Sequence, residues 1–249
     1  MEILAQFLIR LAFGLAVGMA ITSPQKVSSG FFRNHLYVTL GLTTLATLVL
    51  LQLAQPPALC AGAAAVASFF GAALWLYERK LPGQISLILV AASALVAALF
   101  LEPTAGNAEP VSGLRAISTL TSGLLLGLTT ASMLLGHWYL NAPGMELAPL
   151  RRLLTSASIA VGCQAVVSGV GLAAELSSQS AGSGVWLPFI LLRWSFGLIG
   201  VFVLLWMARE TLKIPNTQSA TGILYVAVIG VFVGELTAAL LSAESAFPL

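Results

Sequence analysis

The chain has 249 residues, of which 58% are hydrophobic and only 8% are charged. Soluble domains carry about 25% charged residues, so this composition cannot cover a water-facing surface. All nine acidic residues are glutamates, which excludes sites that require aspartate, such as aspartyl-protease dyads. We therefore expect one integral membrane domain, residues 1–249, whose small net charge of +2 matters less than its distribution.

A membrane-spanning helix needs about 20 mostly apolar residues. Eight stretches meet this requirement, so we expect an all-α, polytopic bundle of eight transmembrane helices. In chain order these are residues 3–22, 36–54, 57–77, 84–101, 114–139, 152–175, 187–208 and 220–242. The prolines fall at the ends of the stretches, and no stretch has the mid-span Gly/Pro break typical of transporters. Thr217 or Ser219 is expected to be the N-cap of the last helix.

Basic residues alternate between the loops in a way that predicts orientation. Eight of the eleven lysines and arginines lie in every second loop, and therefore on one side of the membrane: Lys26, Arg33, Arg79, Lys80, Arg151, Arg152, Arg209 and Lys213. Basic loops remain in the cytoplasm. Both termini are therefore expected outside, in a bacterial cytoplasmic (inner) membrane.

Two helices share a local sequence. Residues 8–15 read LIRLAFGL and residues 191–198 read LLRWSFGL, so Arg10 and Arg193 each precede a Phe-Gly pair by three positions. The tripeptide Leu-Tyr-Val then occurs near the start of the next helix in both cases, at 36–38 and 224–226. We expect a parallel repeat of helices 1–2 and 7–8, related by an axis along the membrane normal. Chance similarity between leucine-rich helices is the alternative.

The two arginines mark the main candidate site. An arginine within a membrane span costs at least about 2.5–3.5 kcal/mol, and the cost is usually met by a partner charge or a polar cavity. The topology places Arg10, Arg193 and Glu235 together in the outer third of the membrane. Gln6 lies on the same helix face as Arg10, and Glu175 lies at the outer end of the sixth helix.

We therefore predict that these five residues line a ligand-binding cavity in the outer half of the membrane. Its guanidinium groups suit a carboxylate, a phosphate head group or a quinone carbonyl. The alternative is a structural ion-pair cluster that holds the first, seventh and eighth helices in register. Three Gly-x-x-x-Gly pairs, at 14/18, 123/127 and 230/234, allow close approach between helices.

A secondary candidate lies on the cytoplasmic side and consists of His137, Trp138 and His35. His137 is expected to be the only histidine within a helix, because His35 follows a loop-like segment. Two histidines at one depth can ligate a haem or a metal. We favour the alternative, in which each histidine bonds to a carbonyl or a lipid phosphate, and we expect no metal site.

Patterns typical of enzymes are missing from the sequence. It has no Ser-His-Asp set, HExxH, phosphate-binding glycine loop or CxxC, so we expect no catalytic activity of its own. Nothing in the sequence indicates nucleic-acid binding.

The last two helices carry a short pattern, with Arg193 and Gly197 in one helix and Gly234-Glu235 in the next. Over about 50 residues this resembles the eight-helix anchor subunits of the dimethyl-sulfoxide-reductase type, although no arginine follows Glu235. The resemblance implies that Arg193 and Glu235 lie near quinol and that partner subunits hold the redox cofactors. We thus expect a quinol-interacting or lipid-binding anchor subunit of a redox complex.

Two alternatives stay open. The first is a secondary transporter for a small anionic or zwitterionic solute, with Glu235 as the proton-coupling residue. The second is a structural or assembly protein whose charges only fix helix packing.

Overall fold

The structure is a computed structural model that describes residues 1–101, 112–142, 144–177, 186–214 and 216–249. Within these ranges it contains helices and no strand. Eight of the helices described there are long and apolar enough to cross a membrane. This confirms the prediction of an all-α, multi-pass integral membrane protein.

The helix bounds follow the predicted apolar stretches closely. Six spans come first: α1 (Glu2–Ile21), α2 (Ser29–Gln52), α3 (Ala58–Leu76), α4 (Lys80–Phe100), α5 (Ser112–Asn141) and α6 (Ala148–Ser177). The seventh consists of α7 (Trp186–Leu192), η2 (Arg193–Gly200) and α8 (Val201–Thr211), and the eighth is α9 (Thr217–Glu244). Many helices extend past the apolar run because polar residues at their ends are also helical.

The start of α2 differs most from the prediction. The helix begins at Ser29, so His35 lies within it and not in a loop. Phe31 and Phe32 are fully buried, and the Phe32 ring stacks on the Trp75 ring of α3 with centroids 4.1 Å apart. This packing stabilises an additional stretch of helix before the apolar run. The prediction that His137 is the only helical histidine is therefore wrong.

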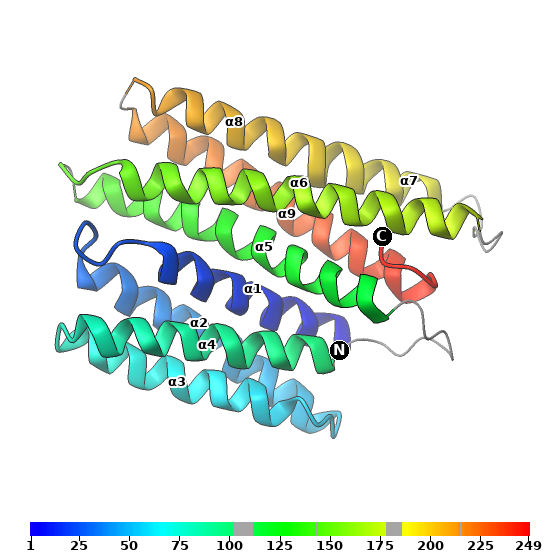
Figure 1. The fold of residues 1–249 in the computed structure, drawn as a ribbon, viewed down its shortest axis with the longest axis horizontal. Coiled ribbons are helices and arrows are strands. Elements are labelled where there is room, and N and C mark those ends of the chain that lie inside the picture. The colour runs from blue at the N-terminus through cyan, green and yellow to red at the C-terminus, as the bar shows by residue number, and fades with distance from the viewer. Residues whose placement is uncertain (102–111, 143, 178–185, 215) are drawn as a thin grey trace.

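The helices form two groups that meet at α1 and α5 (Figure 1). Helices α1 to α4 pack together, and α5 packs with α6 and α9. Glycines bring α1 and α5 into backbone contact. A Cβ added to Gly14 would lie 1.8 Å from the carbonyl oxygen of Gly123, and one added to Gly127 would lie 1.8 Å from the carbonyl carbon of Gly14. Only glycine fits at this crossing.

The seventh span is not a continuous α-helix. Its segment η2 is a π-helix, a rare conformation that occurs often at functional sites. Here Gly197 meets α9, since a Cβ added to it would lie 2.6 Å from the Cα of Gly234. The sequence predicts one span over 187–208, without a mid-span Gly/Pro break. The segment Trp186–Thr211 is long and apolar enough to cross a membrane, as predicted, and the π-helix within it is an addition that the sequence did not indicate.

The N-cap of α9 is Asn216, not Thr217 or Ser219. The Asn216 side chain accepts a hydrogen bond of 3.0 Å from the backbone N–H of Ser219. Asparagine is as good a cap as serine, and it stands one residue before the first helical residue.

Residues 1 and 249 lie at the same end of the bundle, which we call the terminal end (Figure 1). The eight basic residues lie toward the opposite end, either in the connections between α1 and α2, α3 and α4, α5 and α6, and α8 and α9 or in the helix turns that border these connections.

Candidate functional site

A buried ion pair joins the seventh and eighth spans. Nη1 of Arg193 lies 2.7 Å from Oε1 of Glu235, and the two side chains are 1% and 2% exposed. Nη2 of Arg193 also donates to the Ser168 hydroxyl on α6 at 3.5 Å. The pair predicted from the sequence is therefore formed, and it ties η2, α9 and α6 together.

Glycine makes room for this pair. Arg193 is the first residue of η2, one turn before Gly197, and Glu235 directly follows Gly234. The contact between the two glycines brings the helix backbones close enough for the side chains to meet. A Cβ added to Gly234 would also lie 3.4 Å from Nη1 of Arg193.

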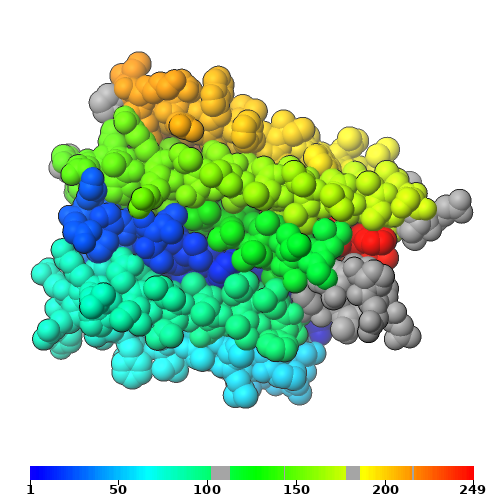
Figure 2. Space-filling view, in the orientation of Figure 1, coloured from blue at the N-terminus to red at the C-terminus, as the bar shows by residue number. Residues whose placement is uncertain are grey.

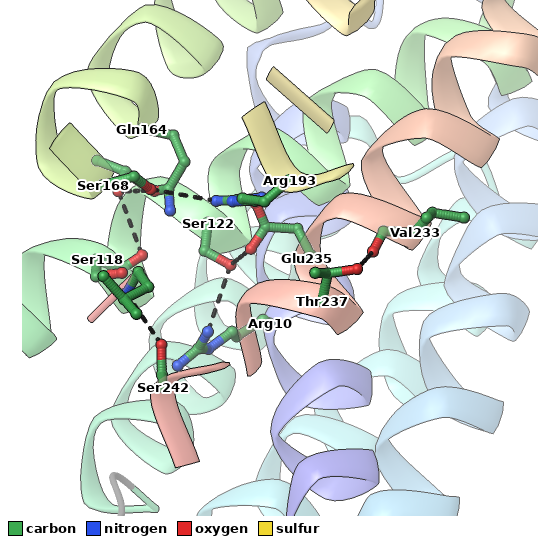
Figure 3. A network of polar contacts seen from close by, with 12 residues as sticks. Arg10, Ser118, Ser122, Gln164, Ser168, Arg193, Val233, Glu235, Thr237 and Ser242 are labelled. Atoms are coloured by element: carbon green, nitrogen blue, oxygen red, sulfur yellow. Dashed lines mark hydrogen bonds and ion pairs between the residues drawn. The ribbon is translucent and has the colours of Figure 1, made fainter. Parts of the chain in front are cut away.

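Ser122 of α5 links this pair to Arg10 (Figure 3). Its hydroxyl donates to Oε2 of Glu235 and accepts a hydrogen bond of 3.4 Å from Nη1 of Arg10. Nη2 of Arg10 donates to the Thr119 hydroxyl at 2.8 Å. The two arginines thus lie on opposite sides of one Ser122–Glu235 hydrogen bond, as Figure 3 shows.

Gln6 lies one turn before Arg10 on α1 and faces its guanidinium. With its carbonyl oxygen turned toward Arg10, Gln6 accepts from Nε at 3.2 Å and from Nη2 at 2.7 Å. Arg10 is the ninth of the 20 residues of α1, counting from Glu2.

A cavity of about 630 Å³ lies at the terminal end and reaches this network. Its polar lining comes from Gln6, Arg10, Arg115, Ser118, Gln164 and Glu235, together with residues nearer the end of the bundle. Its apolar lining includes Ile3, Leu53, Leu101, Ala238, Ala239 and Leu249. Small-molecule sites are typically about 300–1,000 Å³, mostly apolar, with a few convergent polar groups. The cavity fits that description.

The deep part of the cavity offers a hydrogen-bond donor and an acceptor side by side. Arg10 supplies N–H donors and Glu235 supplies carboxylate oxygens, and the single Ser122 hydroxyl bridges them. Arg193 lies behind Glu235 and does not line the cavity. It acts through the carboxylate, which it holds in place by the ion pair.

Glu175 contacts the segment that follows α9. It is buried on α6, and its Oε2 accepts a hydrogen bond of 3.2 Å from the backbone N–H of Phe247. It does not line the cavity, although the sequence placed it in the ligand site. This partner is a backbone amide, and no side-chain pattern in the sequence indicates such a bond.

Sequence reasoning missed the contribution of α5. Arg115, Ser118 and Ser122 follow a spacing of three and four residues, which places them on one helix face toward the cavity and the ion pair. That spacing was visible in the sequence. Hydroxyls in membrane helices usually bond within their own helix, however, so the spacing alone does not indicate a site.

The three residues of the secondary candidate lie at the opposite end of the bundle with separate partners. Nδ1 of His35 lies 2.6 Å from the carbonyl oxygen of Phe31, whereas Nδ1 of His137 lies 3.2 Å from the Tyr225 hydroxyl. Trp138 donates to the Ser28 hydroxyl at 3.0 Å, and its ring centroid lies 6.3 Å from that of His35. The described residues contain no group of three or more His, Cys, Asp or Glu that could hold a metal ion.

No protein-family model, no curated protein and no solved structure matches the chain.

Proposed function

We propose that this protein binds a quinone or quinol in the cavity, as a non-catalytic membrane anchor subunit of a redox complex. One observation gives this proposal its main support. A guanidinium and a carboxylate, bridged by one hydroxyl, meet in the buried part of a mainly apolar cavity of about 630 Å³.

The guanidinium and the carboxylate suit both redox states of a quinone, the oxidised quinone and the reduced quinol. The carbonyl oxygen of a quinone accepts from Arg10, and the hydroxyl of a quinol donates to the Glu235 carboxylate. The apolar walls suit the ring and the first part of an isoprenoid tail. A phosphate group alone would pair with Arg10 but would be repelled by the carboxylate beside it.

The proposal includes an orientation and a repeat. Both termini, and therefore the cavity, face the outside, because the eight basic loop residues belong in the cytoplasm of a bacterial inner membrane. Helices 1–2 and 7–8 form a parallel repeat, supported by a shared feature. Gly14 and Gly197 each follow an arginine by four residues and each touch a glycine of another helix.

The test is quinone content and quinone binding of the purified protein in detergent. Co-purifying quinones and lipids are extracted and quantified, and short-chain ubiquinone and naphthoquinone are titrated against tryptophan fluorescence. Arg10→Gln and Glu235→Gln are expected to lower quinone affinity at least about tenfold, because each removes a charge-assisted hydrogen bond. Arg152→Gln, at the opposite end, is the matched control and should bind as wild type does.

Unchanged quinone binding in both cavity variants would reject the quinone site. If these variants only lower thermal stability and no ligand co-purifies, the cluster is structural. Unbiased identification of co-purifying proteins tests the partnership separately, since an anchor subunit should carry iron–sulfur or molybdenum subunits with it.

A secondary transporter for a small anionic or zwitterionic solute is the second candidate. The π-helix η2 favours it, because it interrupts a span directly beside Glu235. Transporter sites often lie where a helix is irregular. Proton-coupled uptake of an organic anion into proteoliposomes, lost in Glu235→Gln, would support this function and not the anchor.

A further inference from the structure

The chain folds back on itself after α9. This helix ends at Glu244, Ser245 has extended backbone (φ −112°, ψ 152°), and residues 245–249, which we call the strap, follow. Pro248 and Leu249 are buried and line the cavity. Figure 2 shows this red end of the chain at the terminal end of the bundle, beside α5 and α6.

Two buried charged side chains hold the strap by its backbone. Nη2 of Arg115, on α5, donates to the carbonyl oxygens of Ser245 at 3.3 Å and Ala246 at 2.9 Å. Oε2 of Glu175, on α6, accepts from the N–H of Phe247 at 3.2 Å. A charge removed from water needs strong hydrogen bonds, and here both charges direct such bonds to the strap.

Close contacts fix the remainder of the strap. A Cβ added to Gly171 of α6 would lie 1.8 Å from the carbonyl oxygen of Pro248, so the strap backbone lies directly against the helix. The N–H of Leu249 donates to the Ser242 hydroxyl at 3.1 Å. The strap is therefore held by α5, α6 and α9.

We propose that the strap is a lid on the cavity, which opens when a ligand enters or leaves between α5, α6 and α9. Arg115 couples the two events because it both lines the cavity and holds the strap. A ligand oxygen that reaches Arg115 competes with the strap carbonyls for its N–H groups. The lid rests on the proposed function only in treating the cavity as a ligand site.

Cysteine reactivity tests the lid without any ligand. Cys60 and Cys163 are replaced by alanine, and Ala238→Cys places one thiol on the cavity wall. The rate of its modification by a small charged methanethiosulfonate reagent is measured in detergent. Gly171→Ala should raise that rate about tenfold, because the added methyl group displaces the strap and enlarges the open population.

Two matched variants accompany this measurement. Ser242→Ala removes one strap bond and should raise the rate by a smaller factor. Gly162→Ala makes the same change as Gly171→Ala on the same helix, but its added Cβ meets nothing within 4 Å, so the rate should stay at the background value. A thiol in the fully buried core, Ala157→Cys, must stay unreactive in every variant, which excludes general unfolding.

The lid is rejected if the Ala238→Cys thiol is modified no faster in Gly171→Ala and in Ser242→Ala than in the background protein that carries neither substitution. It is also rejected if Gly162→Ala accelerates modification as strongly as Gly171→Ala does. The outcome is independent of the quinone titration. Faster modification of the thiol in a protein that does not bind quinone supports the lid and rejects the proposed ligand. Quinone binding together with an unchanged modification rate supports the ligand and rejects the lid.

Discussion

The guanidinium of Arg193 and the carboxylate of Glu235 form an ion pair 2.7 Å long in which neither side chain is more than 2% exposed. Removing two charges from water costs several kcal/mol per ion, so such a pair is weak evidence that it adds stability. Its clear consequence is geometric. The pair fixes the Glu235 carboxylate at the cavity wall, where Ser122 donates to its other oxygen.

The ion pair predicts strong non-additivity between two substitutions. Glu235→Gln and Arg193→Gln should each lower the free energy of unfolding by about 3–5 kcal/mol, because each leaves one buried charge without its partner. The double variant should lose clearly less than the sum of the two single losses. Thermal unfolding in detergent measures this cycle. Additive losses would show that the charges do not depend on each other.

The contact between Gly234 and Gly197 predicts a position-specific effect of one methyl group. Gly234→Ala places a Cβ 2.6 Å from the Cα of Gly197 and should destabilise the protein by about 1–3 kcal/mol through overpacking. It should also weaken quinone binding, because the displaced η2 carries Arg193.

The control lies on the same helix. A Cβ at Gly222 meets nothing within 4 Å, so Gly222→Ala should be neutral or stabilise α9 by up to about 1 kcal/mol. Equal melting temperatures for the two variants would contradict the close approach between η2 and α9.

The helices could be predicted because an apolar run of about 20 residues in a bilayer must satisfy its backbone internally. The early start of α2 could not, because it depends on Phe32 stacking on Trp75, a contact between helices. The π-helix η2 has no residue signature comparable to a proline, so the seventh span looked regular.

The candidate site also contains some features that the sequence predicts and others that it does not. The pairing of Arg193 with Glu235 was predictable, because a charge buried in a membrane requires a partner. The bridging role of Ser122 depends on the rotation of α5 against α1 and α9, which the order of residues alone does not specify. The role of Glu175 in holding Phe247 depends on a backbone amide in a segment that lies beyond the last span.

The cap at the start of α9 predicts a difference between two neighbouring residues. Asn216→Ala removes the acceptor for the Ser219 N–H and should cost about 1 kcal/mol, whereas Asn216→Ser should retain most of the stability. Ser219→Ala should cost little, because only the backbone of Ser219 takes part in the cap. Melting temperatures of the three variants test this, and a larger loss in Ser219→Ala would instead favour a serine cap.

The position of Ser122 between two charged side chains predicts that its hydroxyl contributes more to the free energy of unfolding than another buried hydroxyl on the same helix. Ser122→Ala removes the donor to Glu235 and the acceptor for Arg10, and both partners are charged. Bonds to charged groups are worth about 1.5–3 kcal/mol, so we expect a loss of that size. Ser132→Ala is the matched control, since this hydroxyl is also buried on α5 but, among the described residues, bonds to the Leu128 carbonyl of its own helix alone, at 2.7 Å. Its loss should stay below about 1 kcal/mol. Unfolding followed by tryptophan fluorescence compares the two, and equal losses would show that the link through Ser122 adds nothing to an ordinary buried hydroxyl.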